Sequence, residues 1–386
     1  MAFGQAQATD KRLLVIILRG GMDGLHAVVP VGDPAYAGLR GRLAIPRSGD
    51  AAPLTLDSTF GLHKNLAKMH ALYRAGQLLP IHATATAYRE RSHFDAQNVL
   101  ETGAASPFAR TEGWLNKALG ALPRSRPEMG MALSAQAPLL LRGPTPVATW
   151  SPSGLPDVAD DTMARLLSLY QSRDMDLANA LQSAMSANMV AMESGAGDMG
   201  GRYGSRAVVQ LGQIAARFLK DDNGPIAAVM EMGNWDTHAN QGLDQGVLAR
   251  NFTALDDGLD AFRTEMGPAW NNTIVLIATE FGRTAAPNGG GGTDHGTGAA
   301  AFLAGGAING GRVLADCRAS RKARSIRPRP APDHRSAWRH QGRAERPSQR
   351  VHECARPEAF PDSASVRAQR GWCGWLSVAP ARSRGA

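Results

Sequence analysis

Three short segments place carboxylates and imidazoles near the ends of apolar runs. They are Trp235-Asp236-Thr237-His238, Thr279-Glu280-Phe281-Gly282-Arg283 and Thr293-Asp294-His295-Gly296. The apolar runs have the length of buried parallel strands, and the carboxyl ends of such strands share one edge of a sheet. Asp, Glu and His are ligands of divalent metal ions. The pattern therefore predicts a metal-assisted hydrolytic site at that edge.

The first two segments offer metal ligands and a cation for an anionic substrate. Asp236 and His238 are two residues apart, so on an extended segment their side chains point the same way and can share a metal ion. Glu280 directly follows a strand-like run and supplies a further carboxylate, and Arg283 supplies a guanidinium. The alternative is that Glu280 and Arg283 only pair with each other.

A glycine run, residues 288–292, precedes the third segment. It leads into Asp294 and His295, which are further candidate metal ligands. Glycine allows the backbone to approach a bound ion or oxyanion closely. The run is equally compatible with an exposed loop tip. Four other histidines stand singly near apolar segments and are expected to be structural: His26, His63, His70 and His82.

Ser92 and His93 stand at the start of a helix-like stretch that ends at Thr102-Gly103. The free N–H groups and the dipole of a helix N-terminus favour a bound anion or a developing oxyanion. His93 is a candidate catalytic residue because Asp95 and other charges surround it. The alternatives are that Ser92 is only a helix N-cap and that His93 belongs to a polar helix start.

Strand-like apolar runs and helical periodicity alternate along residues 11–316. Strands are predicted at Leu13–Leu18, Leu78–Ile81, Pro225–Met232 and Thr273–Thr279. The stretch Trp114–Leu219 is expected to be mostly helical. The alternation predicts one α/β domain with a mainly parallel central sheet flanked by helices. No apolar run approaches the roughly 20 residues of a bilayer span, so no membrane-spanning segment is expected.

The last 70 residues, 317–386, differ in composition from the rest of the chain. They hold 15 arginines, one lysine, five acidic residues, all three cysteines and a single leucine. Such a segment lacks the apolar periodicity of a core. It is either a genuine basic arm or a stretch translated out of frame from near Asp316, and we favour the frame error. Because it lacks organised aromatic residues, no nucleic-acid partner is expected.

Residues 1–10 read like the end of an export signal. Ala6-Gln7-Ala8 has the A-x-A form of a signal-peptide cleavage site. Alanine is abundant in this chain, so such a triplet also arises by chance. The expected organisation is a signal-peptide remnant over 1–10, an α/β domain over 11–316 and an irregular Arg/Pro-rich tail over 317–386.

Five ordered motifs between about Lys11 and Leu314 resemble the bacterial family catalogued as domain of unknown function 1501. They are Leu18–Gly24, Arg91–Gln97, Trp235–His238, Thr279–Arg283 and Gly292–Gly296. Members typically begin with a twin-arginine export signal, which implies a periplasmic or otherwise exported protein. The family in turn resembles the alkaline phosphatase and sulfatase superfamily. That likeness implies an alkaline-phosphatase-like sandwich and metal-dependent attack on phosphate or sulfate esters.

The same resemblance implies roles for individual residues. Ser92 stands near the nucleophile position, Asp236 and His238 look like the ligands of one metal ion, and Glu280 and His295 look like later ligands. The metal ion is divalent, with Zn, Mn, Mg and Ca all compatible.

The sequence also departs from the superfamily pattern. Phe281 takes the place of a histidine, and Arg19-Gly20 that of a first-strand aspartate, for which Asp23 could substitute as a ligand. A full two-metal site is therefore not expected, and one metal ion, or none, fits the sequence.

The main prediction is an exported hydrolase that uses a divalent cation to polarise a phosphate or sulfate ester of a small molecule or glycan. Ser92 would attack and Arg283 would neutralise the oxyanion. The alternative, favoured by Phe281, is a non-catalytic secreted binding or assembly protein on a degenerate scaffold. The oligomeric state is left open.

The frame error makes a direct prediction about the gene. Resequencing around codon 316 should reveal an insertion or deletion that restores apolar periodicity downstream. A clean read without an indel would leave the basic arm as the correct interpretation.

Overall fold

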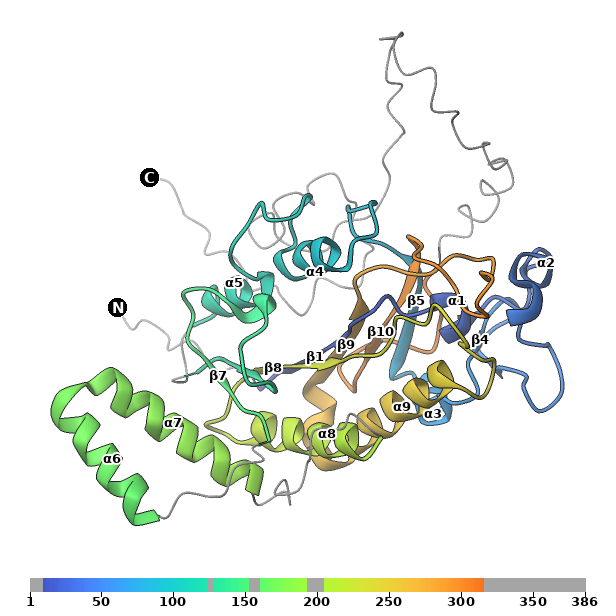
Figure 1. Cartoon of the computed structure of the whole chain (residues 1–386). Coiled ribbons are helices and arrows are strands. Elements are labelled where there is room, and N and C mark those ends of the chain that lie inside the picture. Colours follow the sequence, from blue (N-terminus) through green and yellow to red (C-terminus); the bar gives the residue numbers. More distant parts are fainter. Residues whose placement is uncertain (1–9, 124–125, 127, 153–159, 193–204, 316–386) are drawn as a thin grey trace, which may run out of the picture. The chain divides into compact units, whose positions relative to one another are not determined.

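The computed structural model describes residues 10–123, 126, 128–152, 160–192 and 205–315 (Figure 1). The chain divides into two units after Leu314, and the elements given below belong to the first unit. The tail predicted over 317–386 lies outside the described residues, as does the signal remnant except for Asp10. Their boundaries stay predictions.

A seven-stranded sheet forms the centre of this unit, in the order β5-β10-β9-β1-β8-β6-β7. The pairings of β1 with β8 and β9, and of β6 with β7 and β8, are parallel, whereas β10 runs antiparallel to β5 and β9. The predicted mainly parallel sheet is confirmed. Its strands are β1 (Arg12–Leu18), β5 (Leu78–Thr84), β6 (Gly130–Ala132), β7 (Val147–Thr149), β8 (Ala227–Met232), β9 (Thr273–Thr279) and β10 (Ala299–Ala304).

Strand β1 lies between β8 and β9 and is buried on both faces, which explains its continuous apolar sequence. Its register pairs Leu18 with Met232 of β8 and with Thr279 of β9. The three strands therefore end level with one another. The polar residues that follow them leave the sheet at one edge, as the sequence predicts.

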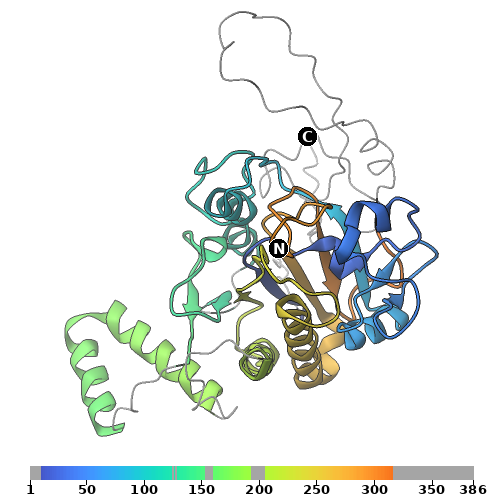
Figure 2. The same ribbon diagram turned by 45° about the vertical axis from the view of Figure 1, so that its right-hand side comes forward.

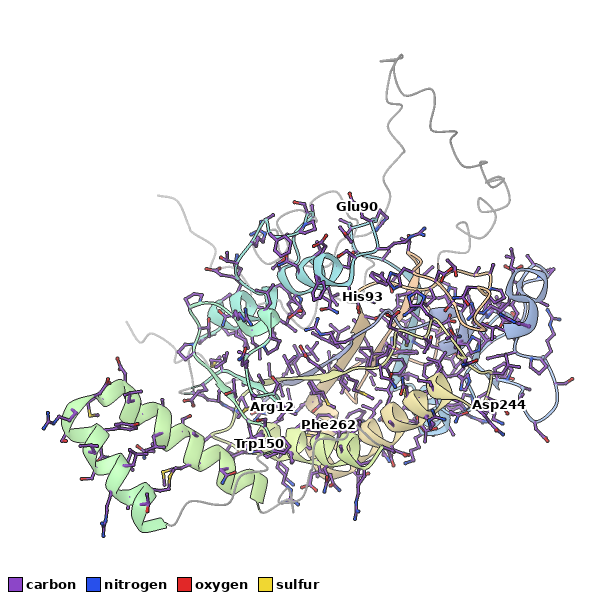
Figure 3. All side chains as sticks on the ribbon, viewed as in Figure 1. Arg12, Glu90, His93, Trp150, Asp244 and Phe262 are labelled. Carbon is purple, nitrogen blue, oxygen red and sulfur yellow. The ribbon has the colours of Figure 1, made fainter. Side chains whose placement is uncertain are left out.

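Helices cover both faces of the sheet (Figures 1 and 2). On one face, Leu115 and Leu119 pack in one cluster with Val15 and Ile17 of β1. His93 and Phe262 mark the two faces in Figure 3. The helices of the first face are α4 (His93–Thr102) and α5 (Trp114–Gly120), and those of the second are α3 (Ala67–Arg74), α8 (Ser205–Lys220) and α9 (Val247–Met266).

Close packing of α8 on α9 depends on two glycines. A Cβ built on Gly212 would lie 2.4 Å from the carbonyl oxygen of Gly258, and one on Gly258 would lie 2.6 Å from the Val208 side chain. Side chains at these positions would push the helices apart. The apolar stripe of α8 thereby reaches the core against α9, with Leu211 and Ile214 buried.

Shorter elements complete the described chain. A small sheet with the order β2-β4-β3 consists of β2 (Val28–Val29), β3 (Leu54–Thr55) and β4 (Gly61–Leu62). The remaining helices are α1 (Gly24–Ala27), α2 (Tyr36–Arg40), η1 (Gly41–Leu43), η2 (Leu139–Leu141), α6 (Asp160–Arg173), α7 (Met175–Met192) and η4 (Gly267–Asn272). No helix among the described residues is both long and apolar enough to cross a bilayer.

The expectation of a mostly helical stretch over 114–219 is wrong for two strands, β6 and β7. Each has only three residues, and their sequences, Gly-Met-Ala and Val-Ala-Thr, show no alternating pattern. Pairing of Gly130 with Ala227 of β8 holds β6 in the sheet. Tertiary pairing, which a local pattern does not reveal, decides the conformation here.

Two of the histidines expected to be structural are held neutral by burial. Desolvation lowers the pKa of His63 to about 4 and that of His82 to about 4. The His63 ring is fully satisfied as a neutral tautomer, since Nε2 donates to the Leu243 carbonyl (3.0 Å) and Nδ1 accepts from the Asn65 N–H (3.2 Å). His82 packs on the ring of Phe60, with centroids 4.9 Å apart.

These histidines predict a loss of stability in mild acid. The unfolded chain takes up a proton on His82 below about pH 6.5, whereas the folded chain does so only near pH 4. The free energy of unfolding should therefore fall between these pH values, and His82→Leu should remove up to about 3 kcal/mol of that loss at pH 4. Urea titrations at several pH values measure it. If the free energy of unfolding fell equally steeply below pH 6.5 in wild type and in His82→Leu, the prediction would be contradicted. Above pH 7 the free energy of unfolding of the two proteins should depend on pH in the same way.

Candidate metal centre

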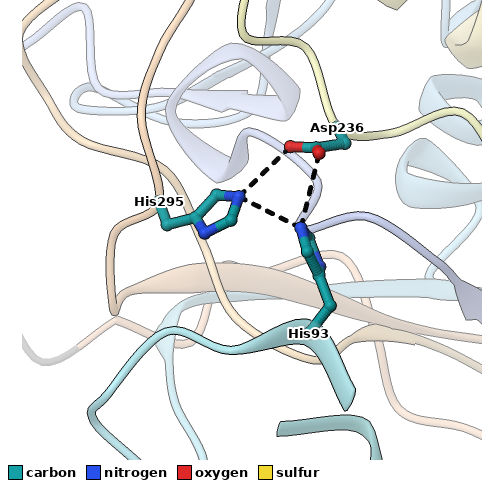
Figure 4. A group of neighbouring side chains, drawn as sticks. All are labelled: His93, Asp236 and His295. Carbon is teal, nitrogen blue, oxygen red and sulfur yellow. Dashed lines mark hydrogen bonds and ion pairs between the residues drawn. The ribbon is translucent and has the colours of Figure 1, made fainter. Parts of the chain in front are cut away.

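Four side chains converge at the edge where β1, β8 and β9 end. Asp236 and His238 follow β8, His295 lies in the loop before β10, and His93 is the first residue of α4. Figure 4 shows His93, Asp236 and His295 turned toward one another from three separate segments. These three offer ligand atoms that all lie within 4.8 Å of each other. The structure thus brings together residues that are about 200 positions apart in the chain.

Nε2 of His295 is at the centre of the cluster. It lies 3.0 Å from Nε2 of His93, 2.9 Å from Nε2 of His238 and 3.3 Å from Oδ1 of Asp236. Asp236 also approaches the other two rings, with Oδ2 3.5 Å from His93 Nε2 and Oδ1 3.1 Å from His238 Nε2. His93, Asp236 and His295 therefore face one small volume, and His238 borders it through its contacts with His295 and Asp236.

The opposite nitrogen of each ring is held by an oxygen atom. Nδ1 of His93 donates to Glu280 Oε1 (2.8 Å), Nδ1 of His295 to the carbonyl of Arg91 (3.0 Å) and Nδ1 of His238 to Asp294 Oδ1 (3.2 Å). An N–H at Nδ1 leaves the Nε2 lone pair free in a neutral ring. This is how metal-binding histidines are oriented.

Protons alone satisfy this cluster poorly. Hydrogen bonding to Glu280 raises the pKa of His93, and burial lowers the pKa of His295, so one proton belongs on His93 and can be shared with His295. Nε2 of His238 would need a further proton to bond to His295 or Asp236. Two imidazolium rings would then stand side by side, which repel each other. A divalent cation would satisfy the lone pairs of His93, Asp236 and His295 at once.

The spacing of the ligand atoms fits such a cation. Zn–N bonds of about 2.0–2.1 Å place neighbouring ligands about 2.9 Å apart at a right angle and about 3.4 Å apart in a tetrahedron. The three contacts among the ligand atoms of His93, Asp236 and His295 are 3.0, 3.3 and 3.5 Å. A nitrogen-rich set of this kind suits Zn²⁺ and similar ions better than Ca²⁺ or Mg²⁺.

Two residues predicted as metal ligands, Glu280 and Asp294, instead orient imidazoles. Glu280 is buried, and its Oε1 accepts from the N–H of Gly20 (2.8 Å) and from Gln97 Nε2 (3.1 Å) as well as from His93. Burial opposes ionisation, but these hydrogen bonds hold the pKa of Glu280 below its ordinary value. His93, predicted as a catalytic residue, takes the ligand position.

Arg283 is not placed to meet a substrate, which corrects its predicted role. Its side chain is fully buried. Nε donates to the Gly21 carbonyl (2.7 Å), Nη1 to the Thr293 carbonyl (3.1 Å) and Nη2 to the carbonyls of Gly20 (2.5 Å) and Trp235 (3.2 Å).

The remaining contact of Arg283, from Nη2, is an ion pair with Asp236. Burial opposes ionisation of this carboxyl, but the hydrogen bond and charge of Arg283 outweigh it and keep the pKa of Asp236 below its ordinary value. The predicted alternative, an ion pair between Arg283 and Glu280, is not formed. Arg283 therefore supports the Asp236 carboxylate from the protein interior and is not exposed to a substrate.

Asp23, a further predicted ligand, lies in a different network. It is buried and pairs with the buried Arg40, and it also accepts from Gln241 Nε2 (2.7 Å) and from the Leu25 N–H (3.1 Å). Burial opposes ionisation of Asp23, but the charge of Arg40 together with the interactions with His26 and Gln241 outweighs it and holds the pKa of Asp23 far below its ordinary value. These partners take up both carboxylate oxygens, so the structure does not bring Asp23 to the cluster.

Ser92 is the N-cap residue of α4, but its hydroxyl makes no capping hydrogen bond to the helix. The simple N-cap interpretation therefore does not account for it. Its backbone carbonyl accepts from the Ala96 N–H (2.9 Å) and continues the helix. The side chain is only partly buried and directly precedes His93.

Phe281 packs beneath two ligands. Its ring centroid lies 4.7 Å from that of His93 and 4.9 Å from that of His295, and the residue is 5% exposed. A Cβ built on Gly21 would lie 2.7 Å from this ring. The apolar ring thus fills the space where the sequence comparison suggested a further ligand.

The glycine run is exposed at Gly289 and Gly290, as the loop-tip alternative predicts, but it is buried at Gly292. Its backbone pairs with the segment after β8, since Asn240 N donates to Gly290 O (3.1 Å) and Gln241 N to Gly291 O (3.0 Å). A Cβ on Gly292 would lie 2.3 Å from the carbonyl oxygen of Thr237. Glycine is needed there so that the two ligand-bearing segments can approach closely.

Sequence reasoning missed one contributor to the site, the carbonyl of Arg91 that orients His295. Arg91 has a left-handed backbone conformation, with φ of 66°. A backbone acceptor carries no signature of residue type, so no sequence signal could have identified it.

Comparison with known proteins gives a family match and distant structural likenesses. A family model described as "Protein of unknown function (DUF1501)" matches residues 10–325. No curated protein matches the chain.

Three of the similar solved structures illustrate the distance. Ps i-CgsB in complex with k-i-k-neocarrahexaose is 13% identical, with a TM-score of 0.37 over 79% of this chain and 68% of that one. The C-terminal periplasmic domain of EcEptC from Escherichia coli, in complex with Zn, is 10% identical (TM-score 0.36; 77% and 73%). The putative sulfatase yidJ from Bacteroides fragilis is 11% identical (TM-score 0.36; 78% and 70%). Likeness at this level carries no argument about chemistry.

The hydrogen bonds that hold the Nδ1 atoms of the three histidines predict a measurable effect on the affinity for a metal ion. Glu280→Gln keeps the shape of the side chain but removes the charge that orients His93 and makes it basic, so Zn²⁺ should bind about 10- to 100-fold more weakly. Competition with a chromophoric chelator measures the dissociation constant. Glu231→Gln, which alters a carboxylate paired with Arg19, is the matched control and should bind normally. Equal affinity of Glu280→Gln and wild type would rule out the orienting role.

Proposed function

We propose that this chain, which belongs to the DUF1501 family, is an exported metal-dependent hydrolase of phosphate or sulfate esters. The observation that carries the proposal is the convergence of three Nε2 atoms and the Asp236 carboxylate, with each Nδ1 engaged by an oxygen. A structural ion pair needs no such arrangement. A site that keeps ligands on one side and an open face on the other is typical of catalytic metal ions.

His93, His295 and Asp236 would hold the cation, and His238 lies beside them against His295. A bound divalent cation acts as a Lewis acid and would polarise the phosphoryl or sulfuryl oxygen of the ester. Asp236 remains 44% exposed at its side chain and His238 43%, so the cluster is open to solvent on the side of these two residues. An anionic ester can approach from there.

Ser92 would act as the nucleophile. Its hydroxyl is not engaged in capping, and it precedes the ligand His93 at the start of α4. In the proposed reaction Oγ bonds to phosphorus or sulfur, the ester oxygen leaves as an alcohol, and water then releases the anion from Ser92. The first-turn N–H groups of α4 and the exposed cation of Arg91 take over the anion-binding role predicted for Arg283.

A second candidate function keeps the metal centre without catalysis. Phe281 occupies the space beside His93 and His295, which leaves no room there for another ligand. A binding or assembly protein with a single structural cation is compatible with that packing. The two candidates differ in turnover rather than in metal content.

The proposed function predicts a separation between metal binding and turnover. Metal-replete wild-type protein should hydrolyse members of a panel of aryl phosphate and sulfate esters. Ser92→Ala should lower kcat by about 10³-fold or more with unchanged metal content, since it removes the attacking oxygen. Asp236→Ala should lose both metal and activity. Metal content is measured by mass spectrometry and turnover by release of the phenol.

Ser134→Ala, a serine outside the cluster, serves as the control and should behave like wild type. Metal retention without turnover of any ester would favour the binding protein. Full activity in Ser92→Ala would exclude Ser92 as the nucleophile. Absence of bound metal in wild type, even after incubation with Zn²⁺ or Mn²⁺, would remove the basis of the proposal.

A further inference from the structure

The fixed charges at the metal centre are negative in excess. Among the described residues, three carboxylates contact the imidazole rings of the centre, those of Asp236, Glu280 and Asp294. One guanidinium, that of Arg283, pairs with Asp236. Two negative charges therefore remain in excess. A single divalent cation would neutralise them and leave no positive charge over.

The surroundings of the three carboxylates favour their charged forms. Oε1 of Glu280 accepts from the Gly20 N–H (2.8 Å), and Oδ1 of Asp294 accepts from Asn288 Nδ2 (2.9 Å). Asp236 is paired with the buried guanidinium. Hydrogen bonds from N–H donors stabilise a carboxylate over a carboxylic acid. All three groups therefore count as full negative charges at neutral pH.

One of these carboxylates stands on the open side of the centre. The side chain of Asp294 is 62% exposed, compared with 44% for Asp236 and 0% for Glu280. Asp294 contacts His238, and an ester would approach past His238 and Asp236. An incoming anion therefore meets the charge of Asp294. The repulsion grows in proportion to the charge of the anion.

The loop before α4 and the first turn of that helix add no net charge. Residues 85–95 contain two arginines, Arg89 and Arg91, and two acidic residues, Glu90 and Asp95. Arg91 can contact an anion, as proposed above, but the exposed Glu90 beside it offsets its charge at longer range. Asp95 lies in the first turn of α4 and opposes the positive end of the helix dipole. The centre with one divalent cation is therefore close to neutral.

A neutral centre discriminates between anions of different charge. Attraction to a local cation grows in proportion to the charge of the ester, whereas the cost of removing the ester from water grows with the square of that charge. A second negative charge therefore costs more than it gains unless the site supplies a second positive charge. The donors of Arg283 are already taken up by backbone carbonyls and Asp236, so this residue does not supply one.

We propose that the substrate is an ester with a single negative charge, either a sulfate monoester or a phosphate diester, and that phosphate monoesters with two charges are poor substrates. The two favoured classes share a tetrahedral centre and one ionised oxygen. Asp294 is then a specificity-determining residue, because it repels the second charge. This inference rests on the proposed function and specifies its substrate class.

The test compares esters that share one leaving group. 4-Nitrophenyl sulfate and methyl 4-nitrophenyl phosphate carry one negative charge, whereas 4-nitrophenyl phosphate carries two above its second pKa of about 6. On Zn²⁺-loaded wild type at about pH 8, kcat/KM should be about 10-fold higher for at least one singly charged ester than for the doubly charged one. The ratio between the sulfate and the diester distinguishes the two favoured classes.

Asp294→Asn separates the charge of this residue from its hydrogen bond. Asparagine keeps an acceptor for Nδ1 of His238 but removes one negative charge at an exposed position. The preference for singly charged esters should fall about 3- to 10-fold, with metal content unchanged. Asp260→Asn, the same change on α9 at the other face of the sheet, is the matched control and should keep the wild-type preference. Differences in the intrinsic reactivity of the esters cancel when variants are compared.

Inhibitor binding tests the inference independently of turnover. Calorimetry on Zn²⁺-loaded protein at about pH 8 would compare methyl phenylphosphonate, which carries one charge, with phenylphosphonate, which carries mainly two. Tighter binding of the singly charged compound, by a factor that shrinks in Asp294→Asn, supports the inference. Equal or tighter binding of the doubly charged compound overturns it, as does an unaltered factor in Asp294→Asn.

Failure of this inference is distinguishable from failure of the hydrolase proposal. If 4-nitrophenyl phosphate is the best substrate, the charge preference is overturned and the hydrolase proposal stands. If no ester is hydrolysed, the hydrolase proposal fails, and calorimetry alone then decides whether the centre selects singly charged anions. Absence of binding by both phosphonates would overturn that selection as well.

Discussion

The interactions of the buried Arg283 guanidinium are those on which the candidate metal centre depends. This guanidinium bonds to carbonyl oxygens in three segments, the turn after β1, the exit from β8 and the loop before β10, and pairs with Asp236. Only a planar group with several fixed donors can satisfy so many acceptors at once. Because these segments carry or contact the ligands, one buried charge sets their relative positions. Replacing it with an apolar side chain would leave four carbonyl groups without this partner, at a cost of about 1–3 kcal/mol for each that stays buried and unsatisfied.

A second buried arginine supports the same loop from the other side. Arg40 donates to the carbonyls of Thr284 (3.0 Å) and Ala285 (3.1 Å) and pairs with Asp23. Gln241 connects this pair to the first network through Thr237 Oγ1 (3.0 Å) and Thr293 Oγ1 (2.9 Å). Buried charges therefore fasten the loop between β9 and β10 at both ends. Buried ion pairs contribute little net stability but specify geometry, which is what a preorganised metal site requires.

The sequence predicts the scaffold of the site better than the roles within it. The apolar run Thr273–Thr279 matches β9 residue for residue, and the level ends of β1, β8 and β9 follow from parallel pairing. Which carboxylate touches a metal and which touches an imidazole depends on side-chain direction, and spacing does not encode that. Glu280 and Arg283 were therefore misassigned, and β6 and β7 were missed because pairing with β8 stabilises strands too short to show a pattern.

Helix α4 connects the metal centre to the substrate side. Two ligand residues lie on segments that the arginines fasten to the sheet edge, whereas His93 comes from α4 and is tied to that edge by Glu280 and, through Arg91, by His295. A cation bound between His93 and the other ligands would add the strongest of these links. On the proposed function, the position of Ser92 then depends on metal occupancy, because Ser92 directly precedes the helix that His93 anchors. The precision with which α4 orients a substrate therefore depends on how firmly His93 is held at the sheet edge.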